Sequence, residues 1–161
     1  MYDWAPGELV RTVRSRFQGL PTFRRVAAID VVLDLHDKLA AAGFIASDFY
    51  DGCLIYDFAA HAIHVVDLDN YRNGPFINHM GRMFGSTRFM AKEEFLLGAR
   101  IDERTTVFAM GRMVEQFLSR DDAGSGALLE VASRACQPEP QLRFPTMAQF
   151  YRAWSAAREQ A

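Results

Sequence analysis

Cysteine and histidine are both scarce in this sequence. Its two cysteines, Cys53 and Cys136, lie far apart without metal-ligand spacing, and its four histidines form neither an HxxxH nor an HExxH pattern. Because zinc sites usually show such spacings, we expect no zinc site in this chain. Two free thiols are typical of a reducing compartment, so the sequence predicts a cytoplasmic location.

The sequence also lacks a surplus of positive charge. Its formal net charge is −2 and its pI is about 6.1, so we expect no nucleic-acid partner. Five arginines do gather near the start of the chain, and we interpret them as a solvated helix face: Arg11, Arg14, Arg16, Arg24 and Arg25.

Long apolar runs are missing as well. No run approaches the roughly 18 apolar residues that a membrane span needs. The first ten residues, MYDWAPGELV, carry a Pro-Gly turn where a signal peptide has its apolar segment. We therefore expect neither a membrane partner nor a signal peptide.

The composition that remains is typical of one globular domain. Half of the 161 residues are apolar and 24% are charged, and no repeat or low-complexity tract interrupts them. This balance favours a chain that folds around a single hydrophobic core.

Helical periodicity dominates the pattern, which predicts an α+β fold that is mainly helical. Apolar residues recur every three or four positions over residues 22–42, and Gly43 follows at the expected end. His36 lies on the apolar face, where we expect a core histidine rather than a ligand. Further helices are predicted at residues 8–17, from an N-cap at Asp102, at 127–136, and after a capping box of Thr146 and Gln149.

A strand pair is predicted between the first helices and the later ones. Residues 53–58 and 62–66 are rich in branched and aromatic side chains and flank a short turn. A polar loop follows over residues 68–85, and its length is typical of functional or mobile loops.

Three loop segments place carboxylates or hydroxyls at the ends of these elements. They are ASDFYDGCLIYDF at residues 46–58, HVVDLDNY at 64–71 and GSTRFMAKEE at 85–94. A hard cation such as Mg²⁺ needs anionic oxygens at such a place. Taken alone, Asp48 is better explained as a residue that caps a turn before a strand.

Together, the three segments resemble the catalytic, metal-binding and substrate-side loops of the protein kinase superfamily. Asp48 and the following LIYD resemble the catalytic loop, VVDLD resembles the strand that ends in Asp-Phe-Gly, and GSTRFMAKE resembles Gly-Thr-x-x-Tyr-Met-Ala-Pro-Glu. TTVFAMG at 105–111 and ACQPEPQLRF at 135–144 resemble two later segments of that family. The resemblance covers nearly the whole chain and implies the C-terminal lobe of such an enzyme, with the predicted hairpin carrying the catalytic and metal-binding loops.

The resemblance implies roles for individual residues of the cleft. Asp48 would be the base that accepts the proton of the substrate hydroxyl, with the hydroxyl of Ser86 beside it. Asp67 would hold the magnesium that bridges the phosphates of ATP, and Asp51 would be a second metal ligand. Leu54 would contact the nucleotide.

The resemblance also implies a structural ion pair between Glu93 and Arg143, which lie fifty positions apart.

Seven other positions depart from the family pattern. Where the family has His, Arg, Lys, Asn, Gly, Pro and Asp, this chain has Ala46, Ser47, Tyr50, Cys53, Asp69, Lys92 and Thr106.

The implied function is transfer of phosphate from ATP to a protein hydroxyl, as in serine/threonine protein kinases. Residues 1–161 would form one domain, with a hinge at 1–7, the catalytic loop at 44–58, the metal-binding loop and activation segment at 64–94, and a helical remainder at 100–157. The nucleotide-clamping N-terminal lobe has no counterpart here, so we expect little activity from this chain alone unless a partner chain or further sequence supplies that lobe.

Two alternatives stay open. A pseudokinase or docking module is favoured by the departures from the family pattern, and a small-molecule kinase is favoured by Asp69. In each case the missing lobe would leave the cleft floor, including Leu54 and Leu68, facing water. Because exposed apolar surface promotes association, we expect the chain to self-associate.

Overall fold

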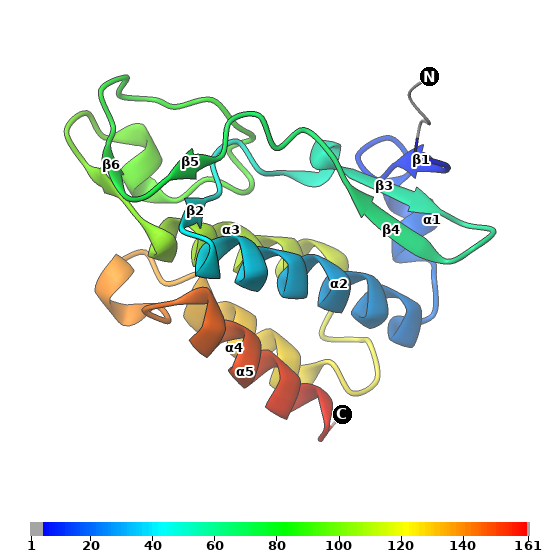
Figure 1. Ribbon diagram of the computed structural model, residues 1–161. Coiled ribbons are helices and arrows are strands. Elements are labelled where there is room, and N and C mark those ends of the chain that lie inside the picture. The colour runs from blue at the N-terminus through cyan, green and yellow to red at the C-terminus, as the bar shows by residue number, and fades with distance from the viewer. Residues whose placement is uncertain (1–4, 161) are drawn as a thin grey trace.

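Figure 1 shows the computed structural model of the chain, which describes residues 5–160. The fold is α+β and mainly helical, with short strands on one side and a group of helices on the other. The α-helices are α1 (Arg14–Gln18), α2 (Thr22–Ala41), α3 (Glu103–Phe117), α4 (Gly126–Ala135) and α5 (Met147–Arg158). The strands are β1 (Glu8–Leu9), β2 (Phe44–Ile45), β3 (Leu54–Asp57), β4 (Ala62–Val65), β5 (Arg72–Asn73), β6 (Phe76–Ile77) and β7 (Arg100–Ile101), and the 3₁₀ helices are η1 (Asp51–Cys53), η2 (Lys92–Phe95) and η3 (Pro140–Leu142).

Helix α3 lies at the centre of the helical group and contacts α2, α4 and α5. Most of its residues are buried, because apolar and small side chains cover the faces that pack against the other helices, while its charged residues lie mainly at its start and on the remaining face. Asp102 caps its start, since the carboxylate accepts the backbone N–H of Arg104 at 3.0 Å. This helix forms the floor on which the loops of the site rest.

Helix α2 confirms the predicted helix at residues 22–42. Its buried stripe includes Ile29, Leu33 and His36, and Gly43 follows it with a φ of 89°, as a helix end requires. His36 is a satisfied core histidine, as predicted. Its Nδ1 donates to the carbonyl of Val32 at 2.8 Å, and its Nε2 accepts the hydroxyl of Tyr71 at 2.6 Å.

Three small antiparallel sheets hold the loops in place. The largest has the order β1-β3-β4, in which Leu54 faces Val65 and Tyr56 faces Ile63, so the predicted hairpin is confirmed. The other two pair β2 with β5 and β6 with β7. The loop after β2 and the loop after β4 therefore both run between the β2–β5 sheet and the β1-β3-β4 sheet (Figure 1).

Two local predictions are wrong. The helix expected at residues 8–17 is a strand followed by a turn, and helix begins only at Arg14, because Glu8 and Leu9 pair with Tyr56 and Ile55. The polar loop at 68–85 also contains β5 and part of the β6–β7 pair. Of the predicted hinge, residues 1–4 lie outside the described residues.

The prediction that the cleft floor is exposed is wrong at Leu54, whose side chain has 0% exposure. Its backbone carbonyl accepts the N–H of Val10 at 2.9 Å, and Val10 is itself fully buried in the same core. The turn after β1 therefore covers this position without any second lobe. Among residues 5–160, no helix combines the length and the apolarity needed to cross a membrane.

Candidate functional site

Asp48 and Asp67 are two of the three described residues other than glycine with left-handed backbone, the third being His61 in the turn between β3 and β4. The φ angles of Asp48 and Asp67 are 65° and 61°, a region that residues with a β-carbon rarely adopt. Asp48 lies in the loop between β2 and β3, and Asp67 lies just after β4. Such a conformation costs on the order of 1 kcal/mol or more and is common where a side chain must point in a required direction.

The two carboxylates interact. Partial burial, and after it the negative charge of Asp67, raise the pKa of Asp48 above its ordinary value. Asn70 opposes this shift, because its Nδ2 donates a hydrogen bond of 3.1 Å to Oδ2 of Asp48. The loop after β4 thus supplies both a charge and a hydrogen-bond donor to the loop that carries Asp48.

Ser86 joins Asp48 in a pocket of about 420 Å³. The segment that carries it approaches closely because Gly85 has a φ of 135°, and a β-carbon there would lie 3.7 Å from Oδ1 of Asp48. The same β-carbon would lie 3.1 Å from Cγ of Met90, so glycine suits this approach. The pocket is lined by Arg11, Asp48, Tyr50, Arg82, Phe84, Gly85, Ser86 and Thr87.

Asp51 is engaged by another side chain. Nη2 of Arg88 donates to both Asp51 oxygens, at 3.0 and 2.9 Å, and the Asp51 side chain is only 2% exposed. The carbonyl of Arg88 in turn accepts Nε of Arg112 at 2.9 Å. The structure therefore places Asp48 and Ser86 in one pocket, with Asp67 near enough to Asp48 for their charges to interact, and it leaves Asp51 in a separate ion pair.

A metal at this place would have few protein ligands. Among the described residues, no group of three or more His, Cys, Asp or Glu side chains is arranged to hold a metal ion. Asp67 is exposed, and Asp48 is near enough for the two charges to interact. Since Mg²⁺ is commonly held by one or two carboxylates, with water and phosphate oxygens completing its ligands, Asp67 fits the role of a magnesium ligand.

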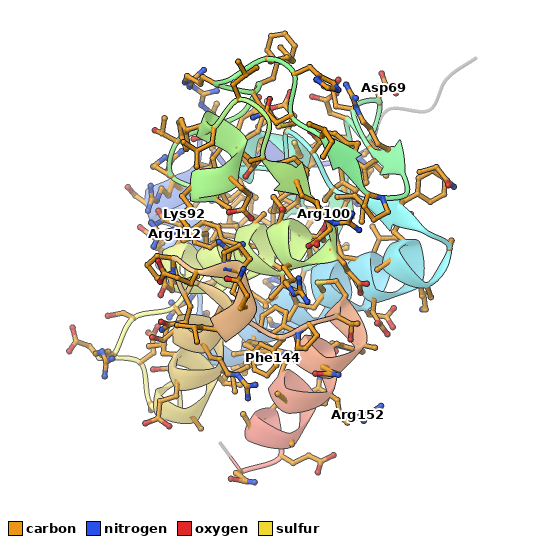
Figure 2. All side chains as sticks on the ribbon, turned by 90° about the vertical axis from the view of Figure 1, so that its left-hand side faces the viewer. Asp69, Lys92, Arg100, Arg112, Phe144 and Arg152 are labelled. Atoms are coloured by element: carbon orange, nitrogen blue, oxygen red, sulfur yellow. The ribbon has the colours of Figure 1, made fainter. Side chains whose placement is uncertain are left out.

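Three other predicted positions are less accessible or more distant. Leu54 is fully buried, so its side chain is not open to a nucleotide in this structure. Cys53 is also buried, and this burial raises the pKa of its thiol to about 11. Asp69 is exposed, does not line the pocket, and lies at the strand-rich end of the molecule, opposite Arg152 of α5 (Figure 2).

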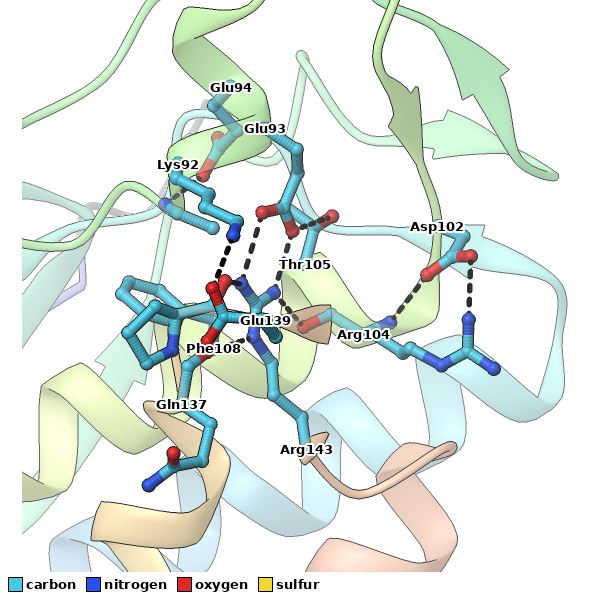
Figure 3. Close-up of polar contacts among 12 residues, drawn as sticks. Lys92, Glu93, Glu94, Asp102, Arg104, Thr105, Phe108, Gln137, Glu139 and Arg143 are labelled. Atoms are coloured by element: carbon cyan, nitrogen blue, oxygen red, sulfur yellow. Dashed lines mark hydrogen bonds and ion pairs between the residues drawn. The ribbon is translucent and has the colours of Figure 1, made fainter. Parts of the chain in front are cut away.

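The ion pair of Glu93 and Arg143 is present and buried (Figure 3). Arg143 donates from Nη1 and Nη2 to the two Glu93 oxygens, at 2.6 and 3.0 Å, and Oγ1 of Thr105 donates to Oε1 at 2.9 Å. The remaining donors of Arg143 contact the carbonyls of Gln137, Pro138 and Arg104. This network ties the segment that carries Ser86 to α3 and to the turn before α5.

A second contact holds the start of the loop that carries Asp48. Oγ1 of Thr106 accepts the backbone N–H of Ala46 at 3.0 Å, and Ala46 and Ser47 are both buried. Thr106 lies at the position where the resemblance places a bracing aspartate, and here its hydroxyl makes the brace. The loop is thus fixed to the central helix two residues before Asp48.

Sequence reasoning missed Asn70, Arg88 and the contact of His36 with Tyr71. Asn70 could have been noticed as the amide that ends the run DLDN in a polar loop. Arg88 and Tyr71 carry no local signal, because their partners lie 37 and 35 positions away.

Compared with known protein families and with curated proteins, the chain matches none.

Proposed function

We propose that this chain is the acceptor- and metal-holding half of a serine/threonine protein-kinase-like phosphotransferase. One observation carries the proposal: Asp48 and Asp67 both have left-handed backbone and lie near enough for the charge of Asp67 to raise the pKa of Asp48, and Asp48 lines one pocket with Ser86. The free thiols of Cys53 and Cys136 support a cytoplasmic location for this activity.

Each residue has a defined role in the proposal. Asp48 accepts the proton of the acceptor hydroxyl, and its raised pKa suits a base that must gain a proton during the transfer. Asn70 holds the Asp48 carboxylate in one orientation through the 3.1 Å hydrogen bond. Asp67 binds magnesium, and magnesium with ATP supplies the phosphoryl group and neutralises its charge.

The scaffold contacts support the same assignment. The buried pair of Glu93 and Arg143 fixes the segment that carries Ser86, and Thr106 fixes the loop that carries Asp48. Phosphoryl transfer depends mainly on positioning and charge stabilisation, so rigid supports of this kind serve the reaction directly.

A binding module without chemistry is the second candidate, and one contact favours it. Arg88 occupies both oxygens of Asp51, so the second metal ligand suggested by the resemblance is taken by the chain itself. A module of this kind would use the same pocket to dock a partner.

Paramagnetic relaxation by Mn²⁺ tests the proposal in the 161-residue chain. With ATP present, we expect Mn²⁺ to broaden selectively the amide signals around Asp48, Asp67 and Asn70 in a two-dimensional NMR spectrum. Asp67→Asn should abolish this broadening because it removes the anionic ligand. Asp69→Asn is the matched control, since it removes an exposed carboxylate from the same loop and should change nothing.

Three outcomes separate the candidates. Selective broadening that depends on Asp67 supports the phosphotransferase. No selective broadening favours the binding module, and broadening that depends on Asp69 instead favours a small-molecule kinase. In any form of the protein that also contains a nucleotide-clamping lobe, phosphate transfer should disappear with Asp67→Ala.

A further inference from the structure

The pocket beside Asp48 is lined by two arginines from distant parts of the chain. Arg11 lies in the turn after β1, and Arg82 lies between β6 and the segment that carries Ser86. Both side chains are exposed, and within residues 5–160 neither forms an ion pair. The pocket therefore presents two arginines without an ion pair among the described residues, against the one carboxylate of Asp48.

Both arginines are held beside the site by contacts of their own. The backbone N–H of Arg11 donates to the carbonyl of Asp51 at 3.2 Å, and its guanidinium lies 5.7 Å from the centre of the Tyr50 ring. Arg11 thus belongs to the catalytic loop's surroundings rather than to a helix face, which corrects the interpretation made from the sequence. The guanidinium of Arg82 lies 3.5 Å from the carbonyl of Gly85 and 6.0 Å from the ring of Phe95.

Arg88 differs from Arg11 and Arg82 because its charge is already paired within the chain. Its guanidinium is paired with the buried carboxylate of Asp51 at 2.9 Å, so its charge is neutralised within the chain. The charges of Arg11 and Arg82 are open to a ligand, and guanidinium groups match carboxylates in shape and hydrogen bonding.

We infer that this pocket selects acceptor segments in which acidic residues flank the hydroxyl. The carboxylates of such a segment pair with Arg11 and Arg82, while the hydroxyl itself lies toward Asp48 and Ser86. A basic segment would place its cations against the two arginines and be repelled. Naming the hydroxyl as the acceptor rests on the proposed function, whereas the preference for acidic peptides does not.

Fluorescence anisotropy with labelled peptides tests the inference in the 161-residue chain without nucleotide or metal. The probe is a peptide with a serine flanked on both sides by aspartates, and the matched peptide has asparagines in their place. We expect the acidic peptide to bind about tenfold more tightly, since charge-assisted hydrogen bonds to two arginines are gained. Added salt should reduce the preference because the arginines are exposed.

Variants assign the preference to the pocket. The double variant Arg11→Gln with Arg82→Gln should lose the preference for the acidic peptide. Arg120→Gln with Arg152→Gln is the control, since both arginines are exposed and lie outside the residues that line the pocket, and it should keep the preference. Equal binding of the two peptides by the unaltered chain, or an unchanged preference in the Arg11/Arg82 variant, overturns the inference.

The peptide experiment and the Mn²⁺ experiment fail independently. A chain that prefers acidic peptides but binds no Mn²⁺ at Asp67 keeps the inference and loses the proposed phosphotransfer. A chain that binds Mn²⁺ but treats both peptides alike keeps the proposed phosphotransfer and loses the inference.

Discussion

At the scale of single residues, two unusual backbone conformations and two buried ion pairs belong to the loops of the candidate site. Asp48 and Asp67 adopt left-handed backbone, and the pairs Glu93–Arg143 and Asp51–Arg88 bury carboxylates beneath the loops. Positions that conflict with local preference in this way are commonly functional, because the surrounding structure must support them.

The pair of Glu93 and Arg143 gives the clearest prediction at this scale. Arg143→Leu should lower the free energy of unfolding by about 3–5 kcal/mol, because it leaves the carboxylate of Glu93 buried without its partner. Urea denaturation measures the change.

Lys92 provides the matched control for Arg143. Lys92 pairs with Glu139 at 2.8 Å, but these side chains are 47% and 53% exposed. Lys92→Met should therefore change the free energy of unfolding by less than about 1 kcal/mol. Similar losses in Arg143→Leu and Lys92→Met would show that the buried pair contributes no more than a surface pair.

At the scale of elements, α3 and α4 form the most extensive contact in the helical group, and Gly111 lies within it. A β-carbon on Gly111 would lie 2.7 Å from Cβ of Ala135 and 2.8 Å from Sγ of Cys136. Gly111→Ala should therefore destabilise the chain by about 1–3 kcal/mol, because α4 must move away from the helix that supports the site.

The first residue of α4 offers a control for that substitution. A β-carbon on Gly126 would meet nothing within 4 Å, so Gly126→Ala should be neutral or stabilise the chain by about 0.5–1 kcal/mol. Thermal unfolding of the two variants compares them directly. A neutral Gly111→Ala would mean that α3 and α4 have room to separate.

At the scale of the whole molecule, the pH dependence of stability combines two buried groups of opposite effect. Burial lowers the pKa of His36 from 6.5 to about 4, so the unfolded chain binds more protons between these values and stability rises with pH there. Burial raises the pKa of Glu94 from 4.5 to about 8, so the folded chain binds more protons in that range and stability falls with rising pH.

Between pH 6.5 and 8 the Glu94 effect is the larger of the two, because His36 loses most of its remaining proton in the unfolded chain within the first half unit or so of this interval. The free energy of unfolding should fall by about 2 kcal/mol over this interval. Glu94→Gln should remove the fall, since its amide oxygen can still accept the N–H of Ala91 that Glu94 binds at 2.7 Å. His36→Gln should keep the fall, and a fall that survives Glu94→Gln would contradict the assignment.

Self-association also belongs to this scale, but the exposed apolar surface lies elsewhere than predicted. Leu54 is buried, whereas exposed apolar side chains gather along β6 and η2 and just after η2: Ile77, Met80, Phe95, Leu96 and Leu97. Self-association therefore stays a prediction, now attached to these residues instead of the cleft floor.

The sequence by itself determined the elements whose signals are local. The apolar stripe of α2 with Gly43 after it, the branched residues of the hairpin, and the caps Asp102 and Thr146 all act within a few positions. Periodicity and capping depend on neighbours along the chain, so they can be recognised in the sequence alone. The pairing of Glu93 with Arg143 was anticipated only through the resemblance.

Only the tertiary structure decided the contacts between distant segments. Leu9 lies in a strand because it pairs with Ile55, and the backbone carbonyl of Leu54 accepts the N–H of Val10 from the following turn. The pairing of Arg88 with Asp51 and the convergence of Arg11 and Arg82 on one pocket depend on where the loops fold in space. Such contacts are selected by burial and charge after the elements pack, so no local pattern in the sequence encodes them.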